Sequence, residues 1–311
     1  MIEAKNLTKH YGDKTAVDDL TFTVQPGIVT GFLGPNGAGK STTMRMILGL
    51  DAPTHGTVTV GGKPYRRHAR PLQVVGALLE ARAVHTSRSA YNHLLALAAT
   101  HGIAKSRVAE VIEMVGLQDV ARKRAGGFSL GMGQRLGIAS ALLADPETLI
   151  LDEPVNGLDP EGIRWIRDLL KGLAADGHTV FVSSHLMSEM ALTAEHVIVV
   201  GRGRLMADMP MSELIAQASS NAVVVRSPQA AALAKAFVGA DITVTSPEYD
   251  TLEVTGLSVA QVGDRARDLN ISLHGLAPKN ASLEEAFMEM TRDEVEYHAH
   301  TPAGHHVRSA S

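Results

Sequence analysis

The stretch that decides the fold is Gly34-Pro35-Asn36-Gly37-Ala38-Gly39-Lys40-Ser41, which fits the phosphate-loop pattern G-x-x-x-x-G-K-[ST]. It follows Ile28–Leu33, an apolar run typical of a buried strand, and precedes Ser41–Leu50, whose residues favour a helix. Glycines let the backbone wrap around an anion, and the helix start directs its positive dipole end to the same place. The stretch therefore predicts a nucleotide site formed by Gly34, Pro35, Asn36, Gly37, Ala38, Gly39, Lys40, Ser41 and Thr42.

Within this loop the chemistry assigns roles to two side chains. Lys40 is expected to reach the β- and γ-phosphates, and the Ser41 hydroxyl is expected to ligate Mg²⁺. A second acidic motif, Asp152-Glu153, ends the apolar run Leu149–Leu151. Ligands of doubly wound sheets bind at the carboxyl ends of the strands, so Asp152 fits a Mg²⁺ partner and Glu153 fits the base that polarises a water. Alone, such a strand end is more often structural, and its value comes from the phosphate loop.

The rest of the chain predicts an α/β fold with a parallel core sheet. Short apolar strands at Thr148–Leu151, Thr179–Ser183 and His196–Val200 alternate with stretches of helical spacing. Residues 1–35 read as strands that form an antiparallel β subdomain, and residues of about 86–145 read as a helical subdomain. Ser89 or Ser87 is a candidate cap for the first of these helices, and Asp159-Pro160 is a helix start.

Beyond about residue 215 the pattern changes to a small α+β domain over residues 216–291, for which a ferredoxin-like topology is one possibility. Strands are predicted at Ala222–Arg226, Ile242–Thr245, Leu252–Thr255 and Ile271–Leu276, and helices at Pro228–Val238, Val259–Leu269 and Leu283–Met290. Residues 292–311 contain four histidines among Pro, Gly and Ser. A disordered tail is favoured there over a metal site.

Composition limits the classes of function. The 311 residues include 29 Lys+Arg and 33 Asp+Glu, a net charge of −4. No global positive field points to nucleic acid or to an anionic membrane. The absence of cysteine excludes disulfides and thiolate chemistry and suits a reducing cytoplasm. With no apolar run of about 18 residues and no signal peptide, a membrane role is expected to come through a partner.

The kind of nucleotide protein is indicated by Phe128-Ser129-Leu130-Gly131-Met132-Gly133-Gln134-Arg135. It resembles the signature sequence of ATP-binding cassette (ABC) transporter ATPases, and the resemblance covers residues 1–215 with every motif in order. It implies a P-loop NTPase cassette that binds ATP and Mg²⁺. It implies that Tyr11 stacks on adenine and that the nucleotide is also contacted by Ser129, Gly131, Gln134 and Asp159. It further implies that His185 contacts the γ-phosphate and acts with Glu153 in catalysis. Each of these residues alone is more often a structural residue, and their joint order carries the inference.

The resemblance further implies a subunit that hydrolyses ATP to energise a separate multi-span membrane transporter from the cytoplasmic face of the membrane. Two copies are expected to pair head to tail around ATP, and residues 81–91 are expected to receive a membrane-subunit helix. Ser282–Phe287 resembles the tail domain of drug-resistance exporters, which favours export. The alternatives are an importer, a cassette that acts on ribosomes or nucleic acid, and a module that senses ATP without hydrolysis.

Two positions depart from the pattern of the family. Glu80 stands where a glutamine usually touches Mg²⁺ and the attacking water. It is expected to ligate the ion as glutamine does, although an added carboxylate can repel phosphate and shift in pKa. Leu130 stands where glycine is usual, and a negative φ is predicted there because leucine is strained at positive φ. The basic run Arg66–Arg70 is expected to be a solvated loop face.

Overall fold

The computed structural model describes residues 1–80, 84–218, 222–237, 239 and 242–279. They divide into two compact units. The first comprises Met1–His185 and Ile198–Asp208, and the second comprises Leu186–Val197 and the described residues from Met209 onward. No helix among the described residues is long and apolar enough to cross a membrane.

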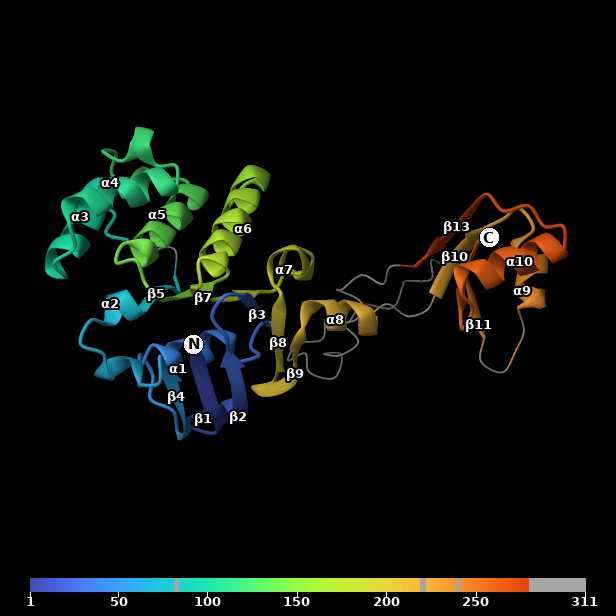
Figure 1. Ribbon diagram of the computed structural model, residues 1–311, viewed down its shortest axis with the longest axis horizontal. Coiled ribbons are helices and arrows are strands. Elements are labelled where there is room, and N and C mark those ends of the chain that lie inside the picture. The colour runs from blue at the N-terminus through green and yellow to red at the C-terminus, as the bar shows by residue number, and fades with distance from the viewer. Residues whose placement is uncertain (81–83, 219–221, 238, 240–241, 280–311) are drawn as a thin grey trace, which may run out of the picture. The chain divides into compact units, whose positions relative to one another are not determined.

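A six-stranded sheet forms the centre of the first unit, with the order β5-β6-β7-β3-β8-β9 (Figure 1). Its strands β5, β6, β7 and β3 pair in parallel. Every residue of β3 and β7 is buried, which is why these strands read as continuous apolar runs. The strands are β3 (Val29–Leu33), β5 (Val75–Leu78), β6 (Thr148–Asp152), β7 (Thr179–Ser184), β8 (His196–Gly201) and β9 (Arg204–Pro210).

A second, antiparallel sheet has the order β2-β1-β4 and joins the first through a shared apolar core. Phe22 of this sheet stacks on Phe181 with ring centroids 6.0 Å apart, and Phe32 lies 5.0 Å from Phe181. These aromatic contacts fix the two sheets against each other close to the strand that feeds the phosphate loop. The strands are β1 (Ile2–Tyr11), β2 (Lys14–Val24) and β4 (His55–Val60).

Three helices, α3, α4 and α5, gather in one region of the first unit (Figure 1). Ser89 caps α3 by accepting from the Asn92 amide, which matches one of the two predicted caps. Asp159 caps α6, and Pro160 is its first residue, as predicted. The helices are α1 (Lys40–Ile47), α2 (Pro71–Val74), α3 (Ala90–Thr100), α4 (Lys105–Met114), α5 (Leu130–Leu142) and α6 (Pro160–Ala175), with 3-10 turns at Tyr65–Arg67, Gln118–Val120 and Ala125–Gly127.

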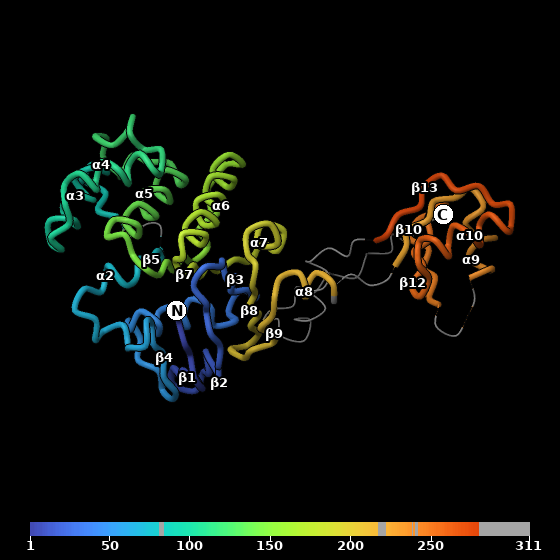
Figure 2. Tube along the Cα trace, in the orientation of Figure 1, coloured from blue at the N-terminus to red at the C-terminus, as the bar shows by residue number. Residues whose placement is uncertain are grey.

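In the second unit the sheet is antiparallel, with the order β11-β12-β10-β13. Along the sequence, helix α9 connects β10 to β11 and helix α10 connects β12 to β13. This is the split βαβ topology of ferredoxin-like folds (Figure 2). The elements are α7 (Met187–Thr193), α8 (Met211–Ala218), β10 (Ala222–Arg226), α9 (Ala230–Ala236), β11 (Thr243–Glu248), β12 (Thr251–Thr255), α10 (Val259–Asp268) and β13 (Gly275–Pro278).

The predicted α/β fold is confirmed, and one predicted strand is misplaced. Residues 271–276 were expected to be a strand, but β13 begins at Gly275. The Ile271 amide bonds the Ala266 carbonyl and closes α10, while Ile271 and Leu273 pack on the core from the connecting segment. Their apolar character therefore reflects packing rather than strand pairing. The predicted helix Leu283–Met290, the stretch Ser282–Phe287 and the tail 292–311 lie outside the described residues.

Candidate functional site

Three neighbouring parallel strands bring the sequence motifs to one edge of the core sheet. In the order β6-β7-β3, Asp152 ends β6, His185 follows β7 and Gly34 follows β3. Parallel pairing places Asp152 opposite Ser183. Because carboxyl ends of parallel strands meet at one edge, motifs more than 100 residues apart in sequence become one site.

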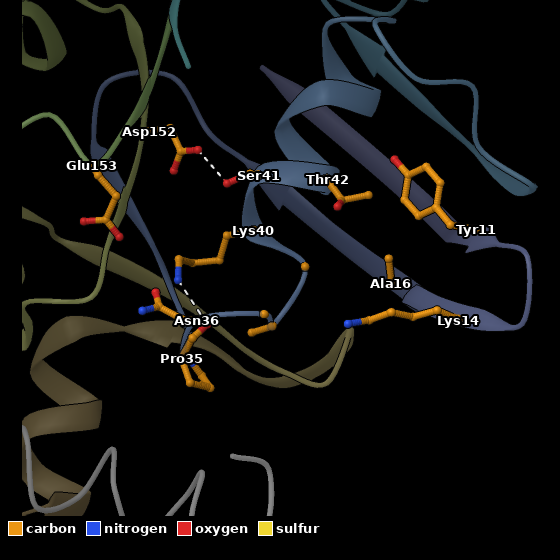
Figure 3. Close-up of a pocket in the computed structure, with 13 residues that line it drawn as sticks. Tyr11, Lys14, Ala16, Pro35, Asn36, Lys40, Ser41, Thr42, Asp152 and Glu153 are labelled. Carbon is orange, nitrogen blue, oxygen red and sulfur yellow. Dashed lines mark hydrogen bonds between the residues drawn. The ribbon is translucent and has the colours of Figure 1, made fainter. Parts of the chain in front are cut away.

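The phosphate loop needs glycine at two points of close approach. A Cβ on Gly34 would lie 2.5 Å from the Val200 carbonyl oxygen, and one on Gly39 would lie 2.5 Å from the Ala16 carbonyl oxygen. Gly39 also has a φ of +97° as it precedes α1. The loop forms the floor of a cavity of about 380 Å³ (Figure 3), lined by Tyr11, Lys14, Ala16, Pro35, Asn36, Gly37, Ala38, Gly39, Lys40, Ser41, Thr42, Asp152 and Glu153.

Lys40 is a buried cation at the wall of this cavity, and the residue is only 7% exposed. Its ammonium donates to the carbonyl oxygens of Gly34, at 2.6 Å, and Pro35, at 3.2 Å. Burial lowers the pKa of Lys40, and the carboxylates of Glu153 and Asp152 oppose that shift. A buried ammonium facing an open cavity is suited to an anionic ligand.

Asp152 lies at the centre of a short polar chain. The Ser41 hydroxyl donates to Asp152 Oδ2 at 2.7 Å (Figure 3), and the Ser183 hydroxyl donates to Asp152 Oδ1. A hydroxyl and a carboxylate are hard oxygen ligands of the kind that Mg²⁺ prefers. The structure thus brings together two of the three residues that the sequence assigned to the metal, Ser41 and Asp152, whereas Glu80 is not among the described residues that line the cavity.

Glu153 adopts a left-handed backbone conformation, with a φ of +50°. Its amide donates to the Ser183 hydroxyl at 2.9 Å, and the buried Gln134 side chain donates to the carbonyls of Glu153 and Pro154 at 3.3 and 3.0 Å. These bonds hold a conformation that is costly for a non-glycine residue. The Glu153 carboxylate bonds His185 Nδ1 at 2.7 Å, so the two predicted catalytic side chains are in direct contact.

Other predicted nucleotide contacts lie outside the residues that line the cavity in the described chain. Ser129 caps α5 by accepting from the Met132 amide, and Asp159 caps α6 by accepting from the Gly162 amide. Gln134 is 2% exposed, and its side chain donates to the backbone carbonyls of Glu153 and Pro154. Glu80 is exposed and close enough to Arg45 to interact with it electrostatically. Roles for these residues toward ATP stay predictions.

Leu130 has the predicted negative φ, because it is the first residue of α5 and is absent from the positive-φ residues of the described chain. Its side chain lies over Gly157, where an added Cβ would meet Leu130 Cγ at 2.4 Å. A Cβ on Gly131 would likewise lie 2.8 Å from the Gly157 carbonyl oxygen. The start of α5 is therefore packed tightly on the loop that precedes α6.

Sequence reasoning missed three residues of the site. Lys14 and Ala16 line the cavity from β2, and Ser183 joins Asp152 to the Glu153 amide. The two-residue connection between β1 and β2 pairs Tyr11 with Lys14, so this hairpin could have pointed to Lys14. Ser183 carried no local signal, because its role depends on pairing between β6 and β7.

Comparison with known proteins places this geometry in context. The family described as "ABC transporter" matches residues 17–156, and a "Domain of unknown function (DUF8746)" matches residues 221–284. The bacitracin transport ATP-binding protein BcrA of Bacillus licheniformis is 44% identical over 217 residues, which cover 69% of this chain and 71% of that protein. The uncharacterized ABC transporter ATP-binding protein YdbJ of Bacillus subtilis is 33% identical over 94% of this chain and 95% of its own length.

Solved structures agree with these relatives. The dimeric structure of a post-hydrolysis state of the ATP-binding cassette MJ0796, bound to ADP and Pi, matches with a TM-score of 0.62 and 26% sequence identity. The match covers 68% of this chain and 99% of that chain. The family match over residues 17–156 contains the cavity-lining residues from Pro35 to Thr42 together with Asp152 and Glu153.

Proposed function

This chain belongs to the ABC transporter family of ATP-binding proteins, and on that premise we propose how its residues bind and hydrolyse ATP to energise a separate membrane transporter. The cavity on the phosphate loop binds the triphosphate, with Lys40 at the β- and γ-phosphates and Tyr11 against the adenine. The single observation that carries this proposal is the convergence of the buried Lys40 ammonium, Ser41, Asp152 and Glu153 on one cavity. The cavity thus offers an ammonium for the phosphates, two oxygen ligands for Mg²⁺ and a carboxylate that can polarise a water molecule.

Glu153 is the general base in this proposal. It lies next to Asp152 on the cavity wall, and its carboxylate is hydrogen-bonded to His185. A carboxylate that is 20% exposed can accept a proton from an attacking water while remaining within reach of solvent. The Glu153 amide, which donates to Ser183, and the Glu153 carbonyl, which accepts from Gln134, hold the residue in place. His185 orients its carboxylate and faces the γ-phosphate in this proposal.

Ser41 and Asp152 are the residues that would hold Mg²⁺, which when bound neutralises charge on the phosphate oxygens. Among the described residues no group of three or more His, Asp or Glu side chains could hold a metal ion. Two oxygen ligands from the protein agree with the habit of Mg²⁺ to take its other ligands from phosphates and water. Glu80 is a further candidate from the sequence.

The transport proposal follows from the relatives. BcrA is named for bacitracin transport, the SrtF proteins of Streptococcus pyogenes for lantibiotic transport and LnrL of Bacillus subtilis for linearmycin resistance. We propose that the partner of this chain exports compounds of that general kind and holds the chain at the cytoplasmic face of the membrane. The dimeric structure of the MJ0796 cassette supports pairing of two copies. In the proposed pair, ATP lies between the copies, and Ser129, Gly131 and Asp159 of one copy face the nucleotide of the other.

The variant Glu153→Gln tests the assignment of the base. We expect turnover to fall by about 10²–10⁴-fold, because an amide cannot accept the proton, while ATP binding is retained. Phosphate release and calorimetric ATP binding are measured on the full chain, and light scattering follows ATP-dependent pairing. Glu161→Gln, an exposed carboxylate in the first turn of α6, is the matched control. Wild-type turnover in Glu153→Gln would remove Glu153 as the base.

A further inference from the structure

The ring of Tyr11 is connected to the helix that follows the phosphate loop. The Tyr11 hydroxyl donates to Asp51 Oδ2 at 2.8 Å, and Arg45 Nε donates to the same oxygen at 2.8 Å. A second guanidinium nitrogen of Arg45 donates to Asp51 Oδ1 at 3.3 Å. Arg45 belongs to the last turn of α1, whose first residue is Lys40. One charged pair therefore links the aromatic end of the cavity to the element that carries the phosphate-binding lysine.

The chain places Asp51 there by the way in which α1 ends. Gly49 has a φ of +65°, and the amides of Leu50 and Asp51 both return to the Arg45 carbonyl, at 2.9 and 3.4 Å. A glycine in the left-handed conformation at the C-terminal end of a helix turns the backbone back across that end. The hydrogen bonds from Arg45 and Tyr11 lower the pKa of Asp51, so the carboxylate stays charged at neutral pH.

The two faces of the Tyr11 ring are not equivalent. The Lys9 ammonium lies 4.8 Å from the ring centroid and donates to the Ala52 carbonyl at 2.8 Å. Tyr11 lines the cavity, whereas Lys9 is not among the described residues that do. Lys9 therefore covers the ring from outside the cavity, and the ring is left with one face for a flat ligand.

We infer that Arg45 and Asp51 are positioning residues that fix the plane of the Tyr11 ring for a single stacked base. They thereby set how much the stacked base contributes to the affinity for the nucleotide. This inference rests on the ATP site proposed above. A ring held in place loses little further freedom when a base stacks on it, and the saved entropy appears as affinity. Because stacking accepts any base, the network governs how strongly a base is held rather than which base is chosen.

Two variants test the network without removing the ring. Tyr11→Phe deletes only the hydroxyl, and Asp51→Ala deletes the acceptor. Binding of ATP and of inorganic tripolyphosphate to the full chain is measured by calorimetry in Mg²⁺. We expect each variant to raise the Kd for ATP by about three- to tenfold and to leave the Kd for tripolyphosphate unchanged. The double variant is expected to match the single variants, because both break one connection. For Asp51→Ala, the KM for ATP should rise while kcat stays the same.

The matched control is Asp18→Ala, which breaks the Asp18–Arg204 pair, an Arg–Asp contact of 2.7–2.8 Å between residues that are not among the described residues lining the cavity. It should leave both Kd values unchanged. An equal loss of ATP and tripolyphosphate binding in Asp51→Ala would overturn the inference, because Asp51 would then act through the phosphate loop. Wild-type ATP affinity in Tyr11→Phe and Asp51→Ala, together with weaker ATP binding in Tyr11→Ala, would overturn this inference and leave the proposed ATP site standing. Full affinity for both ligands in Lys40→Ala would instead overturn the proposed ATP site.

Discussion

Two helices of this protein pack on sheets in different ways. In the first unit, α5 approaches β5 so closely that a Cβ on Gly76 would lie 1.9 Å from the Ala141 carbonyl oxygen. A Cβ on Gly137 of α5 would lie 2.6 Å from Leu78 Cδ1. In the second unit, a Cβ on Gly263 of α10 would meet the end of the Leu276 side chain of β13 at 3.3 Å. The contact between α5 and β5 has no room for a methyl group, whereas the contact between α10 and β13 would admit one after a small shift of Leu276.

The difference follows from what each helix positions. Helix α5 begins at the signature residues, and its Gln134 holds the backbone beyond Asp152. If α5 shifted on the sheet, the hydrogen bond from Gln134 would shift with it and displace the Glu153 carbonyl. In the described part of the second unit, the charged pairs Arg226–Asp250 and Lys279–Glu253 are at least a quarter exposed and lie near the surface. Close approach of helix and sheet is therefore found where a site depends on it.

The largest effect is expected from Gly76→Ala in the close contact. The added methyl group would overlap a backbone carbonyl, which cannot move aside as a side chain can, so we expect a loss of about 3 kcal/mol or more. The thermal midpoint of the first unit should fall by about 6–12 °C, and ATP turnover should fall with it. Differential scanning calorimetry and phosphate release measure these changes.

The control for this variant is Gly172→Ala in α6, where an added Cβ meets nothing within 4 Å. It should raise the stability of the first unit slightly through helix propensity. Equal midpoints in the two variants would show that α5 can move away from β5 at no cost, and the contrast between the units would then disappear.

A smaller effect is expected from Gly157→Ala, which tests the packing of Leu130 on the loop before α6. Gly157 has a φ of +78°, and its added Cβ would overlap Leu130 Cγ. We expect a loss of about 2 kcal/mol, part from the left-handed backbone and part from the overlap. In the double variant with Leu130→Ala, the overlap is relieved and about half of the loss should return. Urea unfolding of the single and double variants gives the difference, and equal losses would contradict the contact.

Local chemistry made part of the site predictable from the sequence. The residues from Gly34 to Ser41 form a site by their own backbone, and Asp152-Glu153 follow a strand whose apolar run is visible in the sequence. Tyr11 and His185 were assigned only through resemblance to a family, because a single tyrosine or histidine has many structural uses. Tyr11 lines the cavity and His185 contacts Glu153, and their roles toward ATP stay predictions.

Contacts between distant segments were not predictable. Ser183 acts through its register with Asp152, and Asp51 acts because the end of α1 turns back toward the hairpin of β1 and β2. Gln134 was expected at the nucleotide, and the structure shows it buried with its side chain donating to the carbonyls of Glu153 and Pro154. The strand predicted over 271–276 was misplaced because a connecting segment that packs on a core has the same apolar pattern as a strand.

The smallest effect, and a gain, is expected from Gly263→Ala in α10. Alanine in a helix interior is favoured over glycine by about 1 kcal/mol, and the 3.3 Å contact requires only the flexible end of Leu276 to shift. A net gain of about 0.5 kcal/mol should appear as slower hydrogen exchange of the α10 amides, with unchanged ATP turnover. A loss above about 1 kcal/mol would mean that α10 is held as closely as α5. Close packing would then be a general property of this chain rather than a requirement of its nucleotide site.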